Sequence, residues 1–330
     1  MSEAPLTPVA HYNLLEPLGS GALGALYRAR DTKVGRTVAL RLADPEIGKN
    51  PALLARFLED ARASATLSHP NIATLWDYGE ADGRYYLAYE FVAGHSLREE
   101  ARGALHPRRA LDLAIQIADA VADAHAHSVL HGDLRPETIF VTGKGSAKIL
   151  DFGMAYWTSG GVVRADATNA PDRLSTDAIK VLAYMSPEQA LGGAVDGRTD
   201  VFSIGTLVYE LVTGRSPFEG TTPGDTVVNV IQARVVPPSE VNSNVPKELD
   251  PVLARALTPD LDNRQQSAAA LAAELRSVAA MLDVRTGDAA EPSVLLPIDD
   301  TPDRKATGLL IGFFVVAAAV AAFVWWLLSR

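Results

Sequence analysis

The chain has 330 residues, of which 48% are hydrophobic and 21% charged, a composition typical of a globular protein that excludes a disordered chain. Its net charge is −10 and no basic patch stands out, so we expect no nucleic-acid partner. The absence of cysteine excludes disulfides, thiolate catalysis and zinc–cysteine sites.

The first part of the chain, after a tail of residues 1–10, is predicted to be rich in strands. The segment Pro51–Leu67 has apolar side chains at helical spacing and is the one predicted helix of this part. Residues 11–93 therefore form a predicted β-rich lobe. Its short β-like runs, bounded by Gly and Asp, are Tyr12–Leu18, Ala25–Arg30, Thr37–Leu42 and Arg84–Val92.

The second part of the chain, about residues 94–282, is predicted to be helical. A strand-rich part followed by a helix-rich part predicts an α+β domain of two lobes over residues 11–282. The segments with helical periodicity are Ala110–His127, Asp200–Val212, Pro246–Ala256 and Ser267–Leu282.

A membrane anchor is predicted near the C-terminal end. Residues 283–307 lack periodicity and are expected to be a juxtamembrane linker. The segment Gly308–Ser329 has no charged residue, and about 22 residues in a helix would cover about 33 Å, close to the hydrocarbon thickness of a bilayer. We therefore expect a single-pass transmembrane helix in the cell membrane.

The flanks of this segment predict its orientation and a contact. Arg304 and Lys305 precede the span and indicate that the preceding domain lies in the cytoplasm, where it would meet protein partners or substrates. Gly308 and Gly312 have the spacing of small residues that lets helices pack closely, which allows self-association through the membrane helix.

A glycine-rich turn is the first candidate for chemistry. Gly19, Gly21 and Gly24 lie between two predicted strands, and glycine lets a backbone approach phosphates closely. By itself this pattern also fits an ordinary glycine-rich hairpin. The same spacing opens dinucleotide-binding folds, but there a helix follows, whereas here a strand does.

Four further segments follow the glycine turn: Val38–Arg41, His131–Thr138, Asp151–Gly153 and Ser186–Glu188. Their order resembles the signature set of protein kinases. Over about residues 11–280 the chain resembles the bacterial Hanks-type, or eukaryotic-like, serine/threonine protein kinases. The resemblance implies a two-lobed kinase fold with a β-rich N-lobe and a helical C-lobe.

The resemblance also implies a site that uses ATP with Mg or Mn. Asp133 would orient the substrate hydroxyl, with Arg135 as the second catalytic residue, and Asp151 and Thr138 would be the metal ligands. Tyr89 would be a bulky gatekeeper. The implied nucleotide-binding residues are Leu18, Gly19, Gly21, Gly24, Ala39, Arg41, Asp60, Glu90, Val92 and Phe140.

Three more matches are expected to serve the architecture. Asp200 resembles the aspartate that braces the catalytic loop. Glu188 and Arg264 resemble a buried ion pair that ties the Ser-Pro-Glu segment to the helical lobe.

The chain departs from the family pattern where the chemistry is most demanding. The departures are Arg41 for lysine, Asp60 or its neighbour Glu59 for glutamate, Gly132 for arginine, Arg135 for lysine, Thr138 for asparagine, and Lys180–Val181 for Gly-Thr. Two interpretations compete. One is an active enzyme in which Arg41 and Asp60 keep the strand-to-helix ion pair. The other, which the sequence favours, is a catalytically impaired or inactive pseudokinase acting as a nucleotide-binding scaffold or allosteric partner, with ATP binding weak or absent.

Two smaller expectations follow from the catalytic loop. His-Gly-Asp also occurs in small-molecule phosphotransferases, which is a further alternative, although their loop needs an asparagine that Thr138 does not supply. Without arginine at Gly132, a phosphate on the activation segment lacks its electrostatic partner, so we predict no such switch. The acceptor hydroxyls considered are those of Thr158, Ser159, Thr168, Ser175 and Thr176.

Overall fold

The N-terminal lobe is built on a five-stranded antiparallel sheet with the strand order β1-β2-β3-β5-β4. The computed structural model describes residues 7–21, 23–157 and 176–287. The strands are β1 (Tyr12–Gly21), β2 (Gly24–Asp31), β3 (Thr37–Ala43), β4 (Leu75–Ala81) and β5 (Arg84–Glu90).

The sheet alternates between two buried faces. On β3, Val38 and Leu40 are fully buried in one cluster with Val9, which the sequence assigned to the tail. Ala39 and Arg41 point to the opposite face, because successive strand residues alternate. That second face carries the candidate site.

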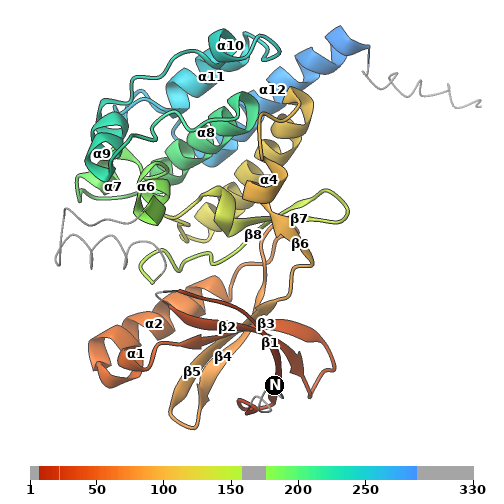
Figure 1. Ribbon diagram of the computed structural model, residues 1–330, viewed down its shortest axis with the longest axis vertical. Coiled ribbons are helices and arrows are strands. Elements are labelled where there is room, and N and C mark those ends of the chain that lie inside the picture. Colours follow the sequence, from red (N-terminus) through yellow and green to blue (C-terminus); the bar gives the residue numbers. More distant parts are fainter. Residues whose placement is uncertain (1–6, 22, 158–175, 288–330) are drawn as a thin grey trace, which may run out of the picture. The chain divides into compact units, whose positions relative to one another are not determined.

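Helix α2 (Pro51–Ser64) covers the second face of the sheet, after the short α1 (Pro45–Lys49) (Figure 1). The Asn50 side chain caps α2 by accepting hydrogen bonds from the first backbone N–H groups of the helix. Phe57 and Ala61 are fully buried against strand residues of the sheet, so α2 is held by its apolar face.

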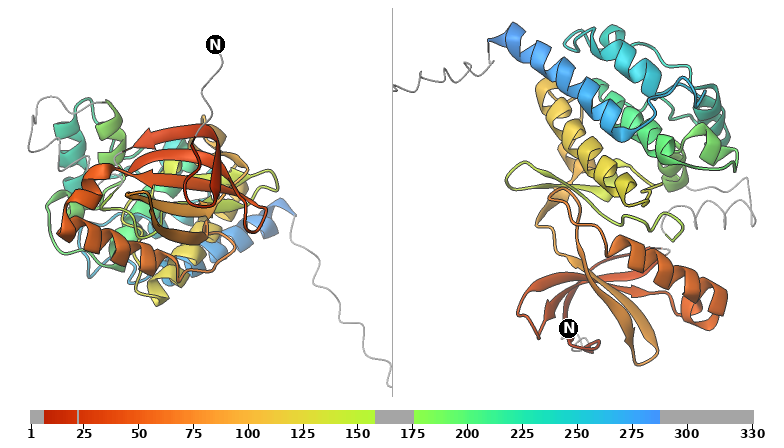
Figure 2. Two further views of the ribbon diagram at one scale, coloured as in Figure 1. Left: turned by 90° about the horizontal axis from the view of Figure 1, so that it is seen from below. Right: turned by 180° about the vertical axis from the view of Figure 1, so that it is seen from behind.

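The C-terminal lobe is mainly helical. Helix α12 packs along α4, and both contact α8 (Figures 1 and 2). The helices are α3 (Leu97–Glu100), α4 (Pro107–Ala126), η1 (Pro136–Thr138), α6 (Thr176–Leu182), α7 (Pro187–Ala190), α8 (Gly197–Thr213), α9 (Pro223–Gln232), α10 (Pro238–Val241), α11 (Leu249–Ala256) and α12 (Ala268–Thr286).

A small sheet carries the catalytic-loop region. Its strand order is β6-β7-β8, with β6 (Gly94–Ser96), β7 (Ile139–Thr142) and β8 (Ala147–Ile149). The Ala73 backbone N–H donates to the Ile149 carbonyl oxygen at 2.8 Å, which joins the segment before β4 to β8.

The predicted elements are confirmed with shifted ends, and so is the two-lobed kinase architecture with a β-sheet N-lobe and a helical C-lobe. Helix α9 and the small sheet were not predicted. Helix α12 continues four residues past the predicted domain end, since the Arg108 Nε atom donates to Asp283 at 2.6 Å and Arg285 pairs with Glu248.

The predicted transmembrane segment Gly308–Ser329 and residues 288–307 of the predicted linker lie outside the described residues. Within the described ranges, no helix combines the length and the apolar character needed to cross a bilayer.

Candidate active site

The glycine turn joins β1 and β2, where Gly21 pairs with Gly24. A Cβ on Gly24 would lie 2.0 Å from the backbone oxygen of Leu42, so glycine is required there by the sheet itself. A Cβ on Gly19 or Gly21 would meet no protein atom within 4 Å. These two glycines therefore leave space for a ligand, whereas Gly24 serves the fold.

The residues predicted to contact adenine come from both lobes. Ala39 on β3 pairs with Tyr89 on β5, and Phe140 lies on β7. Leu18 is 43% exposed at the start of the glycine turn, and Val92 is half-buried just after β5. The Glu90 carboxylate accepts a hydrogen bond from Lys148 Nζ at 2.7 Å, which ties the connection between the lobes to β8.

Arg41 contacts Asp151 rather than Asp60. Its Nη2 atom donates to the two carboxylate oxygens of Asp151 at 3.0 and 3.2 Å, and 12% and 16% of the two side chains are exposed. Asp151 itself has a φ of 54°, in the left-handed region that few residues other than glycine adopt. The ion pair between Arg41 and Asp60 that the active-enzyme interpretation allowed is not formed.

Asp60 is instead bound by Trp157, six residues after Asp151. The Trp157 Nε1 atom donates to the Asp60 carboxylate at 2.7 Å. The Nε atom of Arg56, which lies on α2 like Asp60, is 3.6 Å from the same carboxylate. Burial raises the pKa of Asp60, and the Trp157 hydrogen bond opposes that rise only in part. Glu59 is exposed, so Asp60 is the acidic residue that faces inward.

An aromatic contact holds this arrangement. The ring of Trp157 packs edge-on against Phe57 of α2 with centroids 5.7 Å apart, and Trp157 is only 6% exposed. The Arg56 guanidinium lies 3.7 Å from the ring centroid of Tyr156. Sequence reasoning missed both aromatics, and the adjacent Tyr156–Trp157 pair just after Asp151–Gly153 was the signal that could have found them.

In the loop before η1, the predicted catalytic residues Asp133 and Arg135 contact each other. Arg135 Nε donates to the Asp133 Oδ1 atom at 3.1 Å, and its Nη1 atom donates to Glu137 at 3.3 Å. The Asp133 side chain is 6% exposed. The backbone N–H of Asp133 donates to His131 Nδ1 at 3.1 Å, which fixes the loop.

Thr138 braces this loop from within. Its hydroxyl lies 3.0 Å from the Arg135 carbonyl oxygen and 3.1 Å from that of Asp133, and it accepts the Arg135 backbone N–H at 3.2 Å. Thr138 is 5% exposed. The hydroxyl is therefore engaged with the backbone.

The donor set that the chain itself offers to a divalent ion is small in this arrangement. Mg²⁺ is usually bound by one or two carboxylates together with phosphate oxygens and waters, in near-octahedral geometry. Both oxygens of Asp151 are bound by Arg41, and the hydroxyl of Thr138 faces the loop backbone. Within the part of the chain that the structure describes, no cluster of three or more His, Asp or Glu side chains could hold a metal ion.

The buried Asp200 on α8 fixes the catalytic loop through hydrogen bonds to its backbone. Its two oxygens accept the backbone N–H groups of His131 at 2.8 Å and Gly132 at 2.7 Å, and His125 Nε2 lies 2.8 Å away. Burial raises the pKa of Asp200, but the hydrogen bond and charge of His125, the charge of His131 and the backbone hydrogen bond of Gly132 together outweigh it, so the net pKa is lowered. The ring of Phe152 packs edge-on against His131, with centroids 4.8 Å apart.

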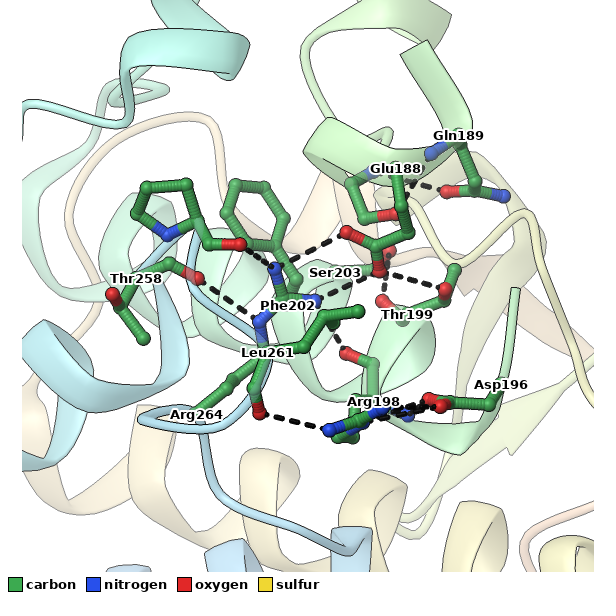
Figure 3. Close-up of polar contacts among 12 residues, drawn as sticks. Glu188, Gln189, Asp196, Arg198, Thr199, Phe202, Ser203, Thr258, Leu261 and Arg264 are labelled. Atoms are coloured by element: carbon green, nitrogen blue, oxygen red, sulfur yellow. Dashed lines mark hydrogen bonds and ion pairs between the residues drawn. The ribbon is translucent and has the colours of Figure 1, made fainter. Parts of the chain in front are cut away.

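Glu188 and Arg264 form the expected buried ion pair (Figure 3). Arg264 Nη1 and Nη2 donate to the two carboxylate oxygens of Glu188 at 2.9 and 3.2 Å, and Arg264 Nε donates to the Thr258 carbonyl oxygen at 3.0 Å. Thr199 donates a further hydrogen bond to Glu188 at 2.8 Å. Burial raises the pKa of Glu188, but the hydrogen bonds from Arg264, the backbone and Thr199 together with the charge of Arg264 outweigh it, so the net pKa is lowered.

A cavity of about 950 Å³ reaches Asp133 from the side of α6, α7 and α9. Gly132 lies in its wall, and a Cβ there would approach Ala155 Cβ to 3.0 Å on a backbone with φ 69°. Val181, one of the departures from the family pattern, belongs to α6 and also lines it. The predicted phosphate acceptors from Thr158 to Ser175 lie outside the described residues, as does the side chain of Thr176.

Comparison with known proteins gives a consistent family match. The family model described as "Protein kinase domain" matches residues 12–275. A probable serine/threonine-protein kinase of Clostridium perfringens, CPE1738, is 34% identical over 270 residues, which cover 81% of this chain and 38% of that protein. PrkC of Bacillus subtilis, named a serine/threonine-protein kinase, is 31% identical over 268 residues, 81% of this chain and 40% of its own length.

The chain spans less than half the length of these curated relatives. Among solved structures, the PknI kinase domain of Mycobacterium tuberculosis matches with a TM-score of 0.64 at 24% identity, covering 84% of this chain and 100% of that chain. At that identity the likeness supports the fold alone.

Proposed function

Because the chain belongs to the protein kinase family, among the bacterial serine/threonine kinases of the Hanks type, we propose a nucleotide-binding signalling role with slow or absent phosphoryl transfer. The observation that carries this proposal is the pairing of Arg41 with Asp151. Phosphoryl transfer depends on fixed positive groups around the phosphates and on metal ions that neutralise the developing charge.

Three positions weigh against efficient transfer. Arg41 is bound to Asp151, Asp60 is bound to Trp157, and the Thr138 hydroxyl is bound to the loop backbone. Losing one preorganised electrostatic contact costs about 10²–10³ in rate. The rate losses at residues that act together are not simply additive. Even so, three such losses would leave little phosphoryl transfer.

An active serine/threonine kinase is the second candidate, and a separate observation favours it. The loop that carries Asp133 is fully braced, with Asp200 accepting the backbone N–H groups of His131 and Gly132. In such an enzyme Asp133 would accept the proton of a substrate hydroxyl and ATP with Mg or Mn would supply the phosphate. The curated relatives carry the name serine/threonine-protein kinase.

A transfer assay with radiolabelled ATP separates the two candidates. The purified full-length chain is incubated with Mg²⁺ or Mn²⁺ and a generic basic protein substrate, beside Asp133→Asn. We expect transfer no faster than in Asp133→Asn. A combined Arg41→Lys, Asp60→Glu and Thr138→Asn variant restores the family residues and is expected to be the faster protein. Wild-type transfer that Asp133→Asn abolishes would favour the active kinase.

The proposed role is that of a scaffold or allosteric partner for proteins in the cytoplasm. It would need the fold and the nucleotide but not the catalytic aspartate. In cells, Asp133→Asn is therefore expected to retain function, whereas a variant that unfolds the helical lobe is expected to lose it. Loss of function in a well-folded Asp133→Asn would contradict the scaffold role.

We also propose that the domain is anchored in the cell membrane through Gly308–Ser329, where the helix can self-associate. The support is the uncharged run itself, with Arg304 and Lys305 before it. The full-length chain is expected to stay in the membrane pellet after alkaline extraction, and a chain lacking residues 308–330 to move to the supernatant. Full-length protein in the supernatant would overturn the anchor.

A further inference from the structure

The candidate site offers one carboxylate to a divalent ion, and that carboxylate is already neutralised. Both oxygens of Asp151 accept hydrogen bonds from Arg41. A metal ion that used Asp151 would have to displace a guanidinium that carries charge of the same sign. The ion and Arg41 therefore compete for one ligand.

The second predicted metal ligand does not face the same place. The Thr138 hydroxyl lies within donating distance of the carbonyl oxygens of Asp133 and Arg135, and Thr138 is 5% exposed. A hydroxyl has one proton and two acceptor positions, and the Arg135 backbone N–H already uses one of these. Thr138 thus maintains the loop and leaves Asp151 without a partner for holding metal.

Two buried donors on the face that carries Asp151 have no hydrogen-bond partner among the residues that the structure describes. They are Arg41 Nε and the hydroxyl of Tyr89, a side chain that is 5% exposed. Residue 89 pairs with Ala39 and residue 41 with Leu87, so both donors lie on the face of the sheet that carries the site. The site therefore has hydrogen-bond donors that an acceptor on a ligand could use.

The chemistry of arginine fits that need. A guanidinium presents five donors in a rigid plane and can bind a carboxylate with one edge and phosphate oxygens with another. A lysine ammonium is a compact point charge with three rotatable donors, which do not form a rigid planar fork. Arg41 can therefore stay on Asp151 and still bind a ligand.

We propose that this chain binds the phosphates of ATP without a divalent metal ion, with the Arg41 guanidinium bridging Asp151 and the phosphate oxygens. The inference rests on the proposed nucleotide-binding role. It adds that the bound ligand is the metal-free ATP anion. Asp151 orients the guanidinium instead of holding metal. The Asp151 carboxylate also repels the phosphates. Its charge is therefore expected to weaken ATP binding, whereas the charge of a metal ligand would strengthen it.

Equilibrium dialysis of radiolabelled ATP against the purified full-length chain, in excess EDTA and in excess Mg²⁺, tests this directly. We expect the two dissociation constants to agree within about threefold. Binding that Mg²⁺ improves by more than about tenfold would overturn the inference and leave the nucleotide-binding role intact. An absence of binding in both conditions would overturn the inference and the nucleotide-binding part of the proposed function together, whatever the transfer assay gives.

The variant Asp151→Asn gives a result of opposite sign under the two mechanisms. If Arg41 supplies the counter-charge, removing the carboxylate charge removes a repulsion, and ATP binds at least as tightly as in the wild type. If Asp151 holds a metal ion, the same variant weakens binding in Mg²⁺ by more than about tenfold, which would overturn the inference. Thermal unfolding of the variant verifies that the domain is folded.

The variant Arg41→Lys keeps the charge and removes the planar fork. We expect binding in EDTA to weaken by about tenfold and a dependence on Mg²⁺ to appear, since a lysine leaves Asp151 less fully bound. Arg30→Lys is the matched control, because Arg30 is exposed on β2 of the same sheet. Binding in EDTA that is equal in Arg41→Lys and Arg30→Lys would contradict the role of Arg41.

Discussion

The Glu188–Arg264 pair of the helical lobe and the Arg41–Asp151 pair of the candidate site use the same chemistry in different settings. Arg264 is fully buried, bonds Glu188 twice and also donates to backbone carbonyl oxygens, with its guanidinium 5.0 Å from the Phe202 ring centroid. Among the described residues, Arg41 has Asp151 as its one hydrogen-bond partner, and its Nε atom has none.

The difference separates a pair that serves the fold from a pair that can also bind a ligand. All donors of the Arg264 guanidinium have acceptors, so no donor of that pair is left for a ligand. The Arg41 guanidinium keeps a donor without an acceptor among the described residues, and the Arg41 and Asp151 side chains are partly exposed. We infer that the first pair stabilises the fold and that Arg41 of the second pair binds a ligand while it stays on Asp151. The following predictions test this contrast, in order of expected size.

The largest effect is expected from Arg264→Met. Removing the guanidinium leaves Glu188 charged and buried, and breaking a buried pair in this way costs about 3–5 kcal/mol. Urea unfolding of the full-length chain measures the change. A loss below about 1 kcal/mol, the range of exposed pairs, would mean that this pair is not architectural.

The pH dependence of the same pair follows from the lowered pKa of Glu188. A carboxylate whose pKa is lower when folded than when unfolded stabilises the fold fully above its unfolded pKa, about 4.3, and loses this as the pH falls through the folded pKa. The difference in unfolding midpoint between the wild type and Glu188→Gln is therefore expected to be large at neutral pH and to shrink under acid. A difference that grows with acid would contradict the sign.

Trp157→Phe probes the hydrogen bond between Trp157 and Asp60. The phenyl ring retains the packing on Phe57 but cannot donate to Asp60, from which Arg56 stays 3.6 Å away, and losing a hydrogen bond to this partly buried carboxylate costs about 1–3 kcal/mol. Thermal unfolding beside Trp76→Phe, an exposed tryptophan on β4, measures it. Equal midpoints for the two variants would mean that the Trp157 hydrogen bond contributes nothing.

The smallest change in stability is expected from Arg41→Met, the counterpart of Arg264→Met. Since the Arg41–Asp151 pair is partly exposed and makes few other contacts, its loss is expected to cost about 1 kcal/mol or less. ATP binding, measured by dialysis, is expected to fall by about tenfold or more. A large loss of stability with unchanged ATP binding would reverse the contrast between the two pairs.

Much of the fold and the identity of the candidate residues could be predicted from the sequence. The run Thr37–Leu42 was predicted as a strand and lies within β3 (Thr37–Ala43). The pair of Glu188 with Arg264 was also expected, because each matches a family position.

The partners within the site could not be predicted in the same way. The sequence offered Asp60, or its neighbour Glu59, as the partner of Arg41 and gave Asp151 as a metal ligand, because local patterns do not rank contacts between distant segments. In the structure Arg41 binds Asp151, and Asp60 is bound by Trp157, to which the sequence gave no role.

The sequence by itself determined the family, the two lobes and the set of residues at the candidate site, because ordered motifs and hydrophobic periodicity are local properties of the chain. Only the tertiary structure decided that Arg41 binds Asp151, that Trp157 binds Asp60 and that Thr138 braces the catalytic loop. Each of these contacts is set by which polar groups are buried side by side, and a buried group takes the partner that lies within reach.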